Sequence, residues 1–79
     1  MNKEEIFSVI TQNAKEIVPD LDSHEFQWDD KLVDLGANSM DRADIVMMTL
    51  ESMDMNIPLV EIAKASNIGE LAALLHEKQ

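Results

Sequence analysis

The apolar residues of this chain recur at the spacing of an α-helix, and nowhere do they alternate as they would in a β-strand. Near the N-terminus, four of them lie three or four positions apart: Ile6, Ile10, Ala14 and Ile17. Asn2 and Glu5 have the spacing of a capping box, which predicts the start of this helix, and Pro19 predicts its end at about Val18. We therefore expect an all-α fold.

The helical period is absent from residues 19–38, which predicts a long loop there. Such a loop is uncommon in a small domain unless its side chains anchor it. Five large apolar residues are spaced along it and are expected to pin it to the helices: Leu21, Phe26, Trp28, Leu32 and Leu35. For Phe26 and Trp28 we favour this core packing over a ligand-stacking pair. A short helical turn is predicted over residues 30–35, ended by Gly36.

Three more helices are predicted after the loop. The longest spans residues 39–55, and five residues form its expected buried stripe: Ala43, Val46, Met47, Leu50 and Met53. A short helix follows over residues 59–65, after a break at Pro58. The last helix begins near Asn67, with Glu70 completing a second capping box.

The whole chain, residues 1–79, is long enough for one domain only. The patterns predict a small four-helix bundle with three main helices, one short helix and a long loop after the first helix. We expect it to be a monomer.

Composition excludes several function classes. Sixteen acidic residues against six basic ones give a formal charge of −10, which disfavours binding to nucleic acid or anionic membranes and favours partner proteins with basic patches. Without cysteine the chain has no thiol of its own and no disulfide. The N-terminus lacks the apolar stretch of a signal peptide and no segment predicts a membrane span, so we expect a cytoplasmic protein.

The segment Leu35-Gly36-Ala37-Asn38-Ser39-Met40-Asp41 carries the most information about function. Its glycine predicts a turn that delivers Ser39 to the N-cap or first turn of the helix over residues 39–55. A phosphodiester at that point would lie close to unpaired backbone N–H groups and the positive helix end. A serine at a helix start is, taken alone, most often only a cap.

This heptad resembles the phosphopantetheine attachment motif of acyl carrier proteins, usually Gly-x-Asp-Ser-Leu or Gly-x-Asp-Ser-Met. The resemblance extends over nearly the whole chain, through the long loop, the Ile57-Pro58 pair and the short third helix. It implies a bundle of acyl-carrier type in which a phosphopantetheinyl transferase attaches 4′-phosphopantetheine to Ser39. Acyl groups would be tethered to that arm as thioesters, and the protein would not be an enzyme. Asn38 replaces the usual Asp, which removes a charge that the transferase could read.

The resemblance also implies that partner enzymes dock on the second helix and the loop before it. Seven residues are expected to contribute to this surface: Asn38, Met40, Asp41, Arg42, Asp44, Met48 and Glu51. For the two methionines, partial burial at the edge of the bundle is an equal alternative. For Asp44 and Glu51, the alternative is a merely solvated face.

In detail the chain is most similar to the free-standing carriers of polyketide β-branching cassettes, on residues 38–48, 56–58 and 67–71. Such a carrier donates an acetyl group to a hydroxymethylglutaryl-CoA-synthase-like enzyme. The similarity therefore implies a role in polyketide, including antibiotic, biosynthesis, with an acyltransferase and a ketosynthase-like decarboxylase as further partners. Acceptor carriers of these pathways bear a Trp in the second helix, where this chain has Ile45, so the donor role is expected.

Other classes of function remain as alternatives. The carrier could bear a fatty acyl or aminoacyl load, or the chain could be an acidic helical adaptor that carries nothing. A hydrolytic role for Ser39 is disfavoured because no base is patterned beside it. His24 and His76 are expected to be solvent-exposed, and neither a metal site nor a calcium-binding loop is predicted.

Overall fold

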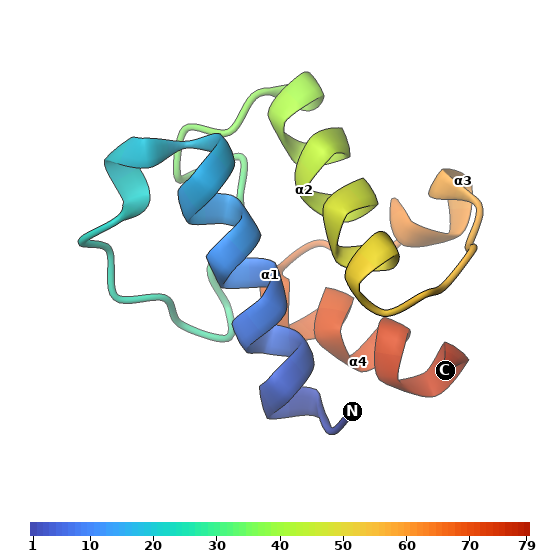
Figure 1. Cartoon of the computed structure of the whole chain (residues 1–79). Helices are drawn as coiled ribbons and strands as arrows, with labels where there is room; N and C mark the ends of the chain where they lie inside the picture. Colours follow the sequence, from blue (N-terminus) through green and yellow to red (C-terminus); the bar gives the residue numbers. More distant parts are fainter.

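The computed structural model describes residues 1–79 and consists of helices only (Figure 1). The elements in chain order are α1 (Lys3–Ile17), the 3₁₀ turn η1 (Pro19–Leu21), α2 (Ser39–Ser52), α3 (Leu59–Ile62) and α4 (Ile68–Lys78). Helix α1 packs against both α2 and α4, and the one-turn helix α3 lies beyond α2. The all-α prediction is confirmed. None of the helices combines the length and apolarity needed to cross a membrane.

The start of α1 is the predicted capping box. The Asn2 side chain accepts a hydrogen bond from the Glu5 backbone N–H at 2.8 Å, and the Glu5 carboxylate accepts one from the Asn2 N–H at 2.9 Å. Both contacts satisfy donors that the helix leaves free at its N-terminus. The apolar face of α1 is then buried as expected, with Ile6, Ile10 and Ala14 inaccessible to solvent.

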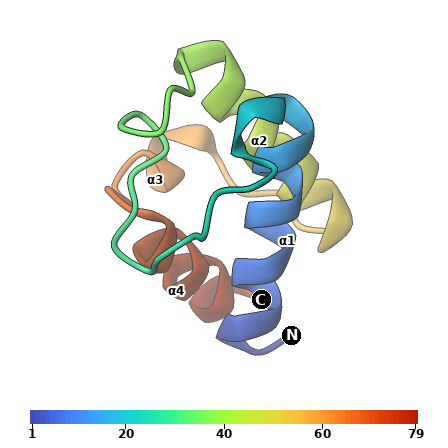
Figure 2. The ribbon, with the colours of Figure 1, turned by 90° about the vertical axis from the view of Figure 1, so that its left-hand side faces the viewer.

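The loop between η1 and α2 crosses to the start of α4 before it returns to α2 (Figure 2). The carbonyl groups of Trp28 and Asp30 accept hydrogen bonds from the N–H groups of Gly69 and Ile68, at 2.7 and 2.9 Å. The loop therefore caps α4, and this contact fixes the position of a segment that has little regular structure.

Within the loop, Asp30 holds the chain in a tight turn. Its carboxylate accepts hydrogen bonds from the Gln27 backbone N–H at 2.8 Å and from His24 Nε2 at 3.0 Å. The hydrogen bond from Gln27, and to a smaller extent the one from His24, lower the pKa of Asp30, because both favour the ionised carboxylate. His24 is half-buried, which differs from the solvent exposure predicted for it, whereas His76 is exposed as predicted.

The loop differs from the sequence prediction in its local structure. The short helical turn predicted over residues 30–35 is present as hydrogen-bonded turns over residues 32–36, with a helical bond from the Leu35 N–H to the Lys31 carbonyl at 3.2 Å. The 3₁₀ turn η1 was not predicted. Phe26 packs against the core, as expected, and lies edge to face with His24, with the ring centroids 4.8 Å apart. Trp28 instead stacks on Phe7 of α1, with the ring centroids 4.3 Å apart, and remains 45% exposed. The two loop aromatic rings therefore do not form a ligand-stacking pair.

The capping box of α4 is displaced by one residue from its prediction. Asn67 accepts a hydrogen bond from the Glu70 N–H at 2.7 Å, as expected. The Glu70 carboxylate, however, accepts its bonds from the backbone N–H and the hydroxyl of Ser66, at 2.8 and 2.7 Å. These bonds lower the pKa of Glu70, the backbone bond most.

Helix α2 is shorter than predicted and is rotated relative to its predicted stripe. It ends at Ser52, because Asp54 adopts a left-handed backbone with φ of 53°. Ile45 and Thr49 are inaccessible to solvent, while Met47 is 55% exposed, so the placement of Met47 in the core is wrong. Helix α3 also stops early, at Ile62.

The burial of Thr49 was not predicted because the residue is polar. Its hydroxyl donates a hydrogen bond to the Ile45 carbonyl at 2.8 Å and accepts one from Asn13 Nδ2 at 3.0 Å. This buried pair joins α1 to α2, and both polar groups are satisfied, which is what makes their burial tolerable.

The contact between Gly69 and the loop yields a stability prediction. A Cβ at position 69 would lie 2.6 Å from the Trp28 carbonyl oxygen, which is backbone and cannot move aside easily. Replacing glycine by alanine inside a helix normally raises the free energy of unfolding by about 1 kcal/mol. In Gly69→Ala, overpacking against the loop should instead lower the free energy of unfolding by about 1–3 kcal/mol. Urea unfolding followed by Trp28 fluorescence measures this change. A more stable variant would contradict the close contact.

Candidate functional site

The N-terminus of α2 is built by a tight turn of the loop. Gly36 has φ of 98°, a left-handed conformation that other residues adopt only with strain. The following N–H, that of Ala37, donates to the Leu32 carbonyl at 3.1 Å, and the Ala37 side chain is buried. This turn anchors the chain immediately before α2.

Asn38, and not Ser39, caps α2. The Asn38 side chain accepts a hydrogen bond from the Asp41 N–H at 2.8 Å, and the Asp41 carboxylate accepts one from the Asn38 N–H at 3.2 Å. Ser39 is consequently the first helical residue. The interpretation of Ser39 as an ordinary capping serine is therefore excluded, since the residue before it fills that role.

The Ser39 side chain is left free by this arrangement. The residue is exposed, and its hydroxyl takes part in none of the side-chain hydrogen bonds within the chain. The backbone N–H groups of Ser39 and Met40 also lack an acceptor, as is usual in the first turn of a helix. Two free donors and the positive helix end beside an accessible hydroxyl suit an anionic group attached at that oxygen. The residues present therefore fit a phosphodiester.

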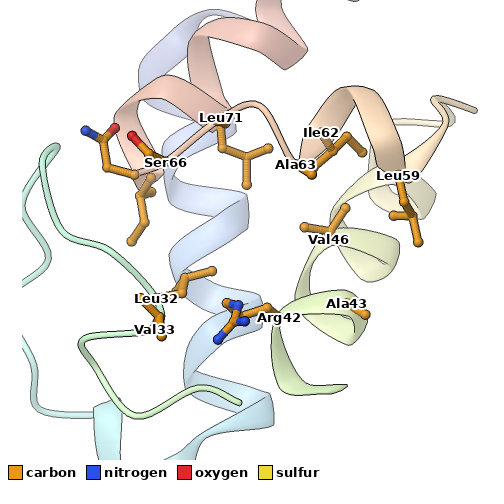
Figure 3. A pocket seen from close by; sticks show the side chains of 13 residues that line it. Leu32, Val33, Arg42, Ala43, Val46, Leu59, Ile62, Ala63, Ser66 and Leu71 are labelled. Carbon is orange, nitrogen blue, oxygen red and sulfur yellow. The ribbon is translucent and has the colours of Figure 1, made fainter. Parts of the chain in front are cut away.

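A pocket of about 460 Å³ opens beside this helix face, between α2, α3, the loop and the start of α4 (Figure 3). Its wall is mostly apolar, with Leu32 from the loop and Ile62 and Leu71 from α3 and α4. Helix α2 contributes three residues: Arg42, Ala43 and Val46. They lie three, four and seven positions after Ser39, so Ser39 begins the stripe of α2 that faces the pocket.

Arg42 is the one charged residue in the pocket wall. Its Nη1 donates a hydrogen bond to the Ala37 carbonyl at 2.7 Å, and the residue is half-buried. Neither of the two ion pairs of the chain involves Arg42. In Figure 3 its guanidinium lies between the loop residues Leu32 and Val33 and the start of α2.

The residues predicted to dock partners differ in exposure. Asn38 and Asp41 are engaged in capping, and Arg42 and Met48 are half-buried. The exposed stripe of α2 consists of four residues: Met40, Asp44, Met47 and Glu51. We call these four residues the α2 stripe. Met40 is 76% exposed on it.

Exposed apolar residues outside α2 were missed by the sequence prediction. Leu59 and Val60 of α3 are 51% and 74% exposed, and Val33 of the loop is 57% exposed. For Leu59 and Val60 the only signal was the shortness of the predicted helix over residues 59–65, because so short a helix cannot bury more than one side. The structure contains no group of three or more acidic or histidine side chains that could hold a metal ion.

Comparison with known proteins agrees with this geometry. A family model described as the phosphopantetheine attachment site matches residues 9–75. The chain is 47% identical over 78 residues to the polyketide biosynthesis acyl-carrier-protein AcpK of Bacillus subtilis (strain 168), covering 99% of this chain and 95% of that protein. It is 28% identical over 67 residues to an acyl carrier protein of Clostridium acetobutylicum, covering 80% of this chain and 87% of that one.

The fold is shared with a solved structure. A chain in the crystal structure of the curacin biosynthetic pathway HMG synthase in complex with acetyl donor-ACP is 42% identical to this one, with a TM-score of 0.93. The match covers 98% of this chain and 99% of that chain. The predicted acyl-carrier bundle is confirmed, as is its covalent cofactor, 4′-phosphopantetheine. The chain therefore belongs to the phosphopantetheine attachment-site family and is an acyl carrier protein.

Proposed function

We propose that Ser39 is the residue that bears 4′-phosphopantetheine, and that the loaded protein donates an acetyl group for polyketide β-branching. The observation that carries the first part is the free hydroxyl of Ser39 at the first position of α2, released from capping by Asn38. The second part is supported by the similarity to a polyketide carrier and to the chain crystallised with an HMG synthase as acetyl donor.

The role of Ser39 in the attachment is that of a nucleophile. A transferase would remove the hydroxyl proton, and the Ser39 oxygen would form a bond to the phosphorus that carries pantetheine in coenzyme A. The bond from that phosphorus to 3′,5′-ADP breaks, and the leaving group takes the electron pair. When bound, the arm supplies the thiol that this cysteine-free chain lacks. The chain itself presents and orients the arm and needs no catalytic base of its own.

We further propose that partner enzymes dock on the α2 stripe. Met40 and Met47 offer apolar contact area, and Asp44 and Glu51 attract basic groups on a partner. Met48 borders this surface and Arg42 lies on the pocket side of α2, while Asn38 and Asp41 form the cap at the start of the helix. The partners are a phosphopantetheinyl transferase, an acyltransferase, a ketosynthase-like decarboxylase and a hydroxymethylglutaryl-CoA-synthase-like enzyme.

The attachment is tested by intact mass after co-expression with a broad-specificity phosphopantetheinyl transferase. The wild type should gain the mass of one phosphopantetheine, and Ser39→Ala should gain none. Ser66→Ala, which alters an exposed serine near α4, is the control and should be modified fully. An unmodified wild type would favour the adaptor function, and a modified Ser39→Ala would place the arm elsewhere.

The docking surface is tested by acetyl transfer from the loaded protein to a hydroxymethylglutaryl-CoA-synthase-like enzyme. Met40→Ala and Met47→Ala should each lower kcat/KM by about tenfold, since truncating a central contact costs about 1–2 kcal/mol. Met48→Ala removes a half-buried neighbour of the same type and should change kcat/KM less. Equal effects of Met47→Ala and Met48→Ala would show that the stripe is misplaced.

A further inference from the structure

Arg42 occupies a place where a positive charge is unfavourable. It lies in the first turn and a half of α2, where the helix end is positive and acidic residues are preferred. It is the only cation of α2, in a chain with sixteen acidic residues, yet no carboxylate pairs with it. A half-buried, unpaired guanidinium is a departure from local preference of the kind that marks functional positions.

The direction of the Arg42 side chain supplies the second observation. Helical side chains lean toward the N-terminus of the helix, and residues three positions apart have Cβ atoms about 5–6 Å apart. Arg42 follows this rule, because its Nη1 reaches back to the carbonyl of Ala37, two residues before Ser39. The guanidinium thus lies on the same stripe as Ser39 and is directed to the end of the helix where Ser39 stands.

We propose that Arg42 binds the phosphodiester of the arm attached to Ser39 and thereby positions the start of the arm over the pocket beside α2. This inference rests on Ser39 being the attachment residue. One of the five guanidinium N–H groups is used by Ala37, and the others are free to donate to phosphate oxygens. The free N–H groups of Ser39 and Met40 supply further donors to the same anion.

The surroundings strengthen this ion pair. Leu32 and Val33 of the loop lie on one side of the guanidinium (Figure 3), and Arg42 itself is half-buried. A charge-assisted hydrogen bond gains strength where solvent is partly excluded. A carboxylate at the far end of the arm is the other anion that a cargo could offer, but only the phosphodiester is tied to Ser39 itself. The protein with an unloaded arm contains the phosphodiester and no cargo, so it isolates the proposed contact.

The test is NMR of the protein with and without the unloaded arm. On attachment, the guanidinium N–H signals of Arg42 should shift, and their exchange with water should slow by about tenfold, as expected for a charge-assisted bond. The ³¹P signal of the arm should differ between wild type and Arg42→Gln, with Arg42→Lys between them. Lys64→Gln removes an exposed cation that lies off α2 and should leave the ³¹P signal unchanged.

The outcomes separate this inference from the proposed function. If no arm is attached, as judged by intact mass, the proposed function itself fails. If the arm is attached to Ser39 but the Arg42 N–H signals do not respond, the inference is wrong. This holds even if Arg42→Gln alters the ³¹P signal, because loss of the bond to the Ala37 carbonyl could change the turn beside Ser39. Amide spectra of Arg42→Gln that match the wild type outside the turn confirm that the variant is folded.

Discussion

The reciprocal hydrogen bonds between Asn38 and Asp41 are the contact on which the functional site depends. They satisfy the donors at the start of α2 and fix where the helix begins. Because the cap is the residue before Ser39, the serine becomes the first helical residue, with an exposed and unbonded hydroxyl. An Asp at position 38 could accept the same bond, so Asn38 retains the geometry of the family motif while it removes one negative charge next to the serine.

A second set of contacts holds this site against the bundle. The loop that leads to Ser39 is tied to α4 through the carbonyl groups of Trp28 and Asp30. The Asp30 carboxylate also orders the preceding turn, because it accepts a hydrogen bond from the Gln27 N–H. Gly69 permits the close approach because a side chain there would strike the loop backbone. The loop then supplies one wall of the pocket at Leu32. A segment without regular structure thus positions both Ser39, the proposed attachment residue, and the apolar surface beside it.

The elements of this fold could be predicted where local rules decide them. The capping pairs and Pro19 marked the ends of α1, and the motif around Ser39 marked the start of α2. The prediction failed where tertiary contacts decide. Periodicity alone could not tell that the polar Thr49 is buried through its bond to Asn13 and that Met47 is consequently turned outward. Ser39 could be identified from its motif as the proposed attachment residue, whereas the pocket arises from segments far apart in the chain.

We propose that capping and attachment are divided between two neighbouring residues, Asn38 and Ser39, and unfolding in urea tests this division most directly. Asn38→Ala removes the cap and should lower the free energy of unfolding by about 1 kcal/mol, whereas Ser39→Ala should change it by less than about 0.5 kcal/mol. Both variants are compared without the arm, so that only the helix terminus differs. If Ser39→Ala were as destabilising as Asn38→Ala, the serine would be part of the cap and its hydroxyl would not be free.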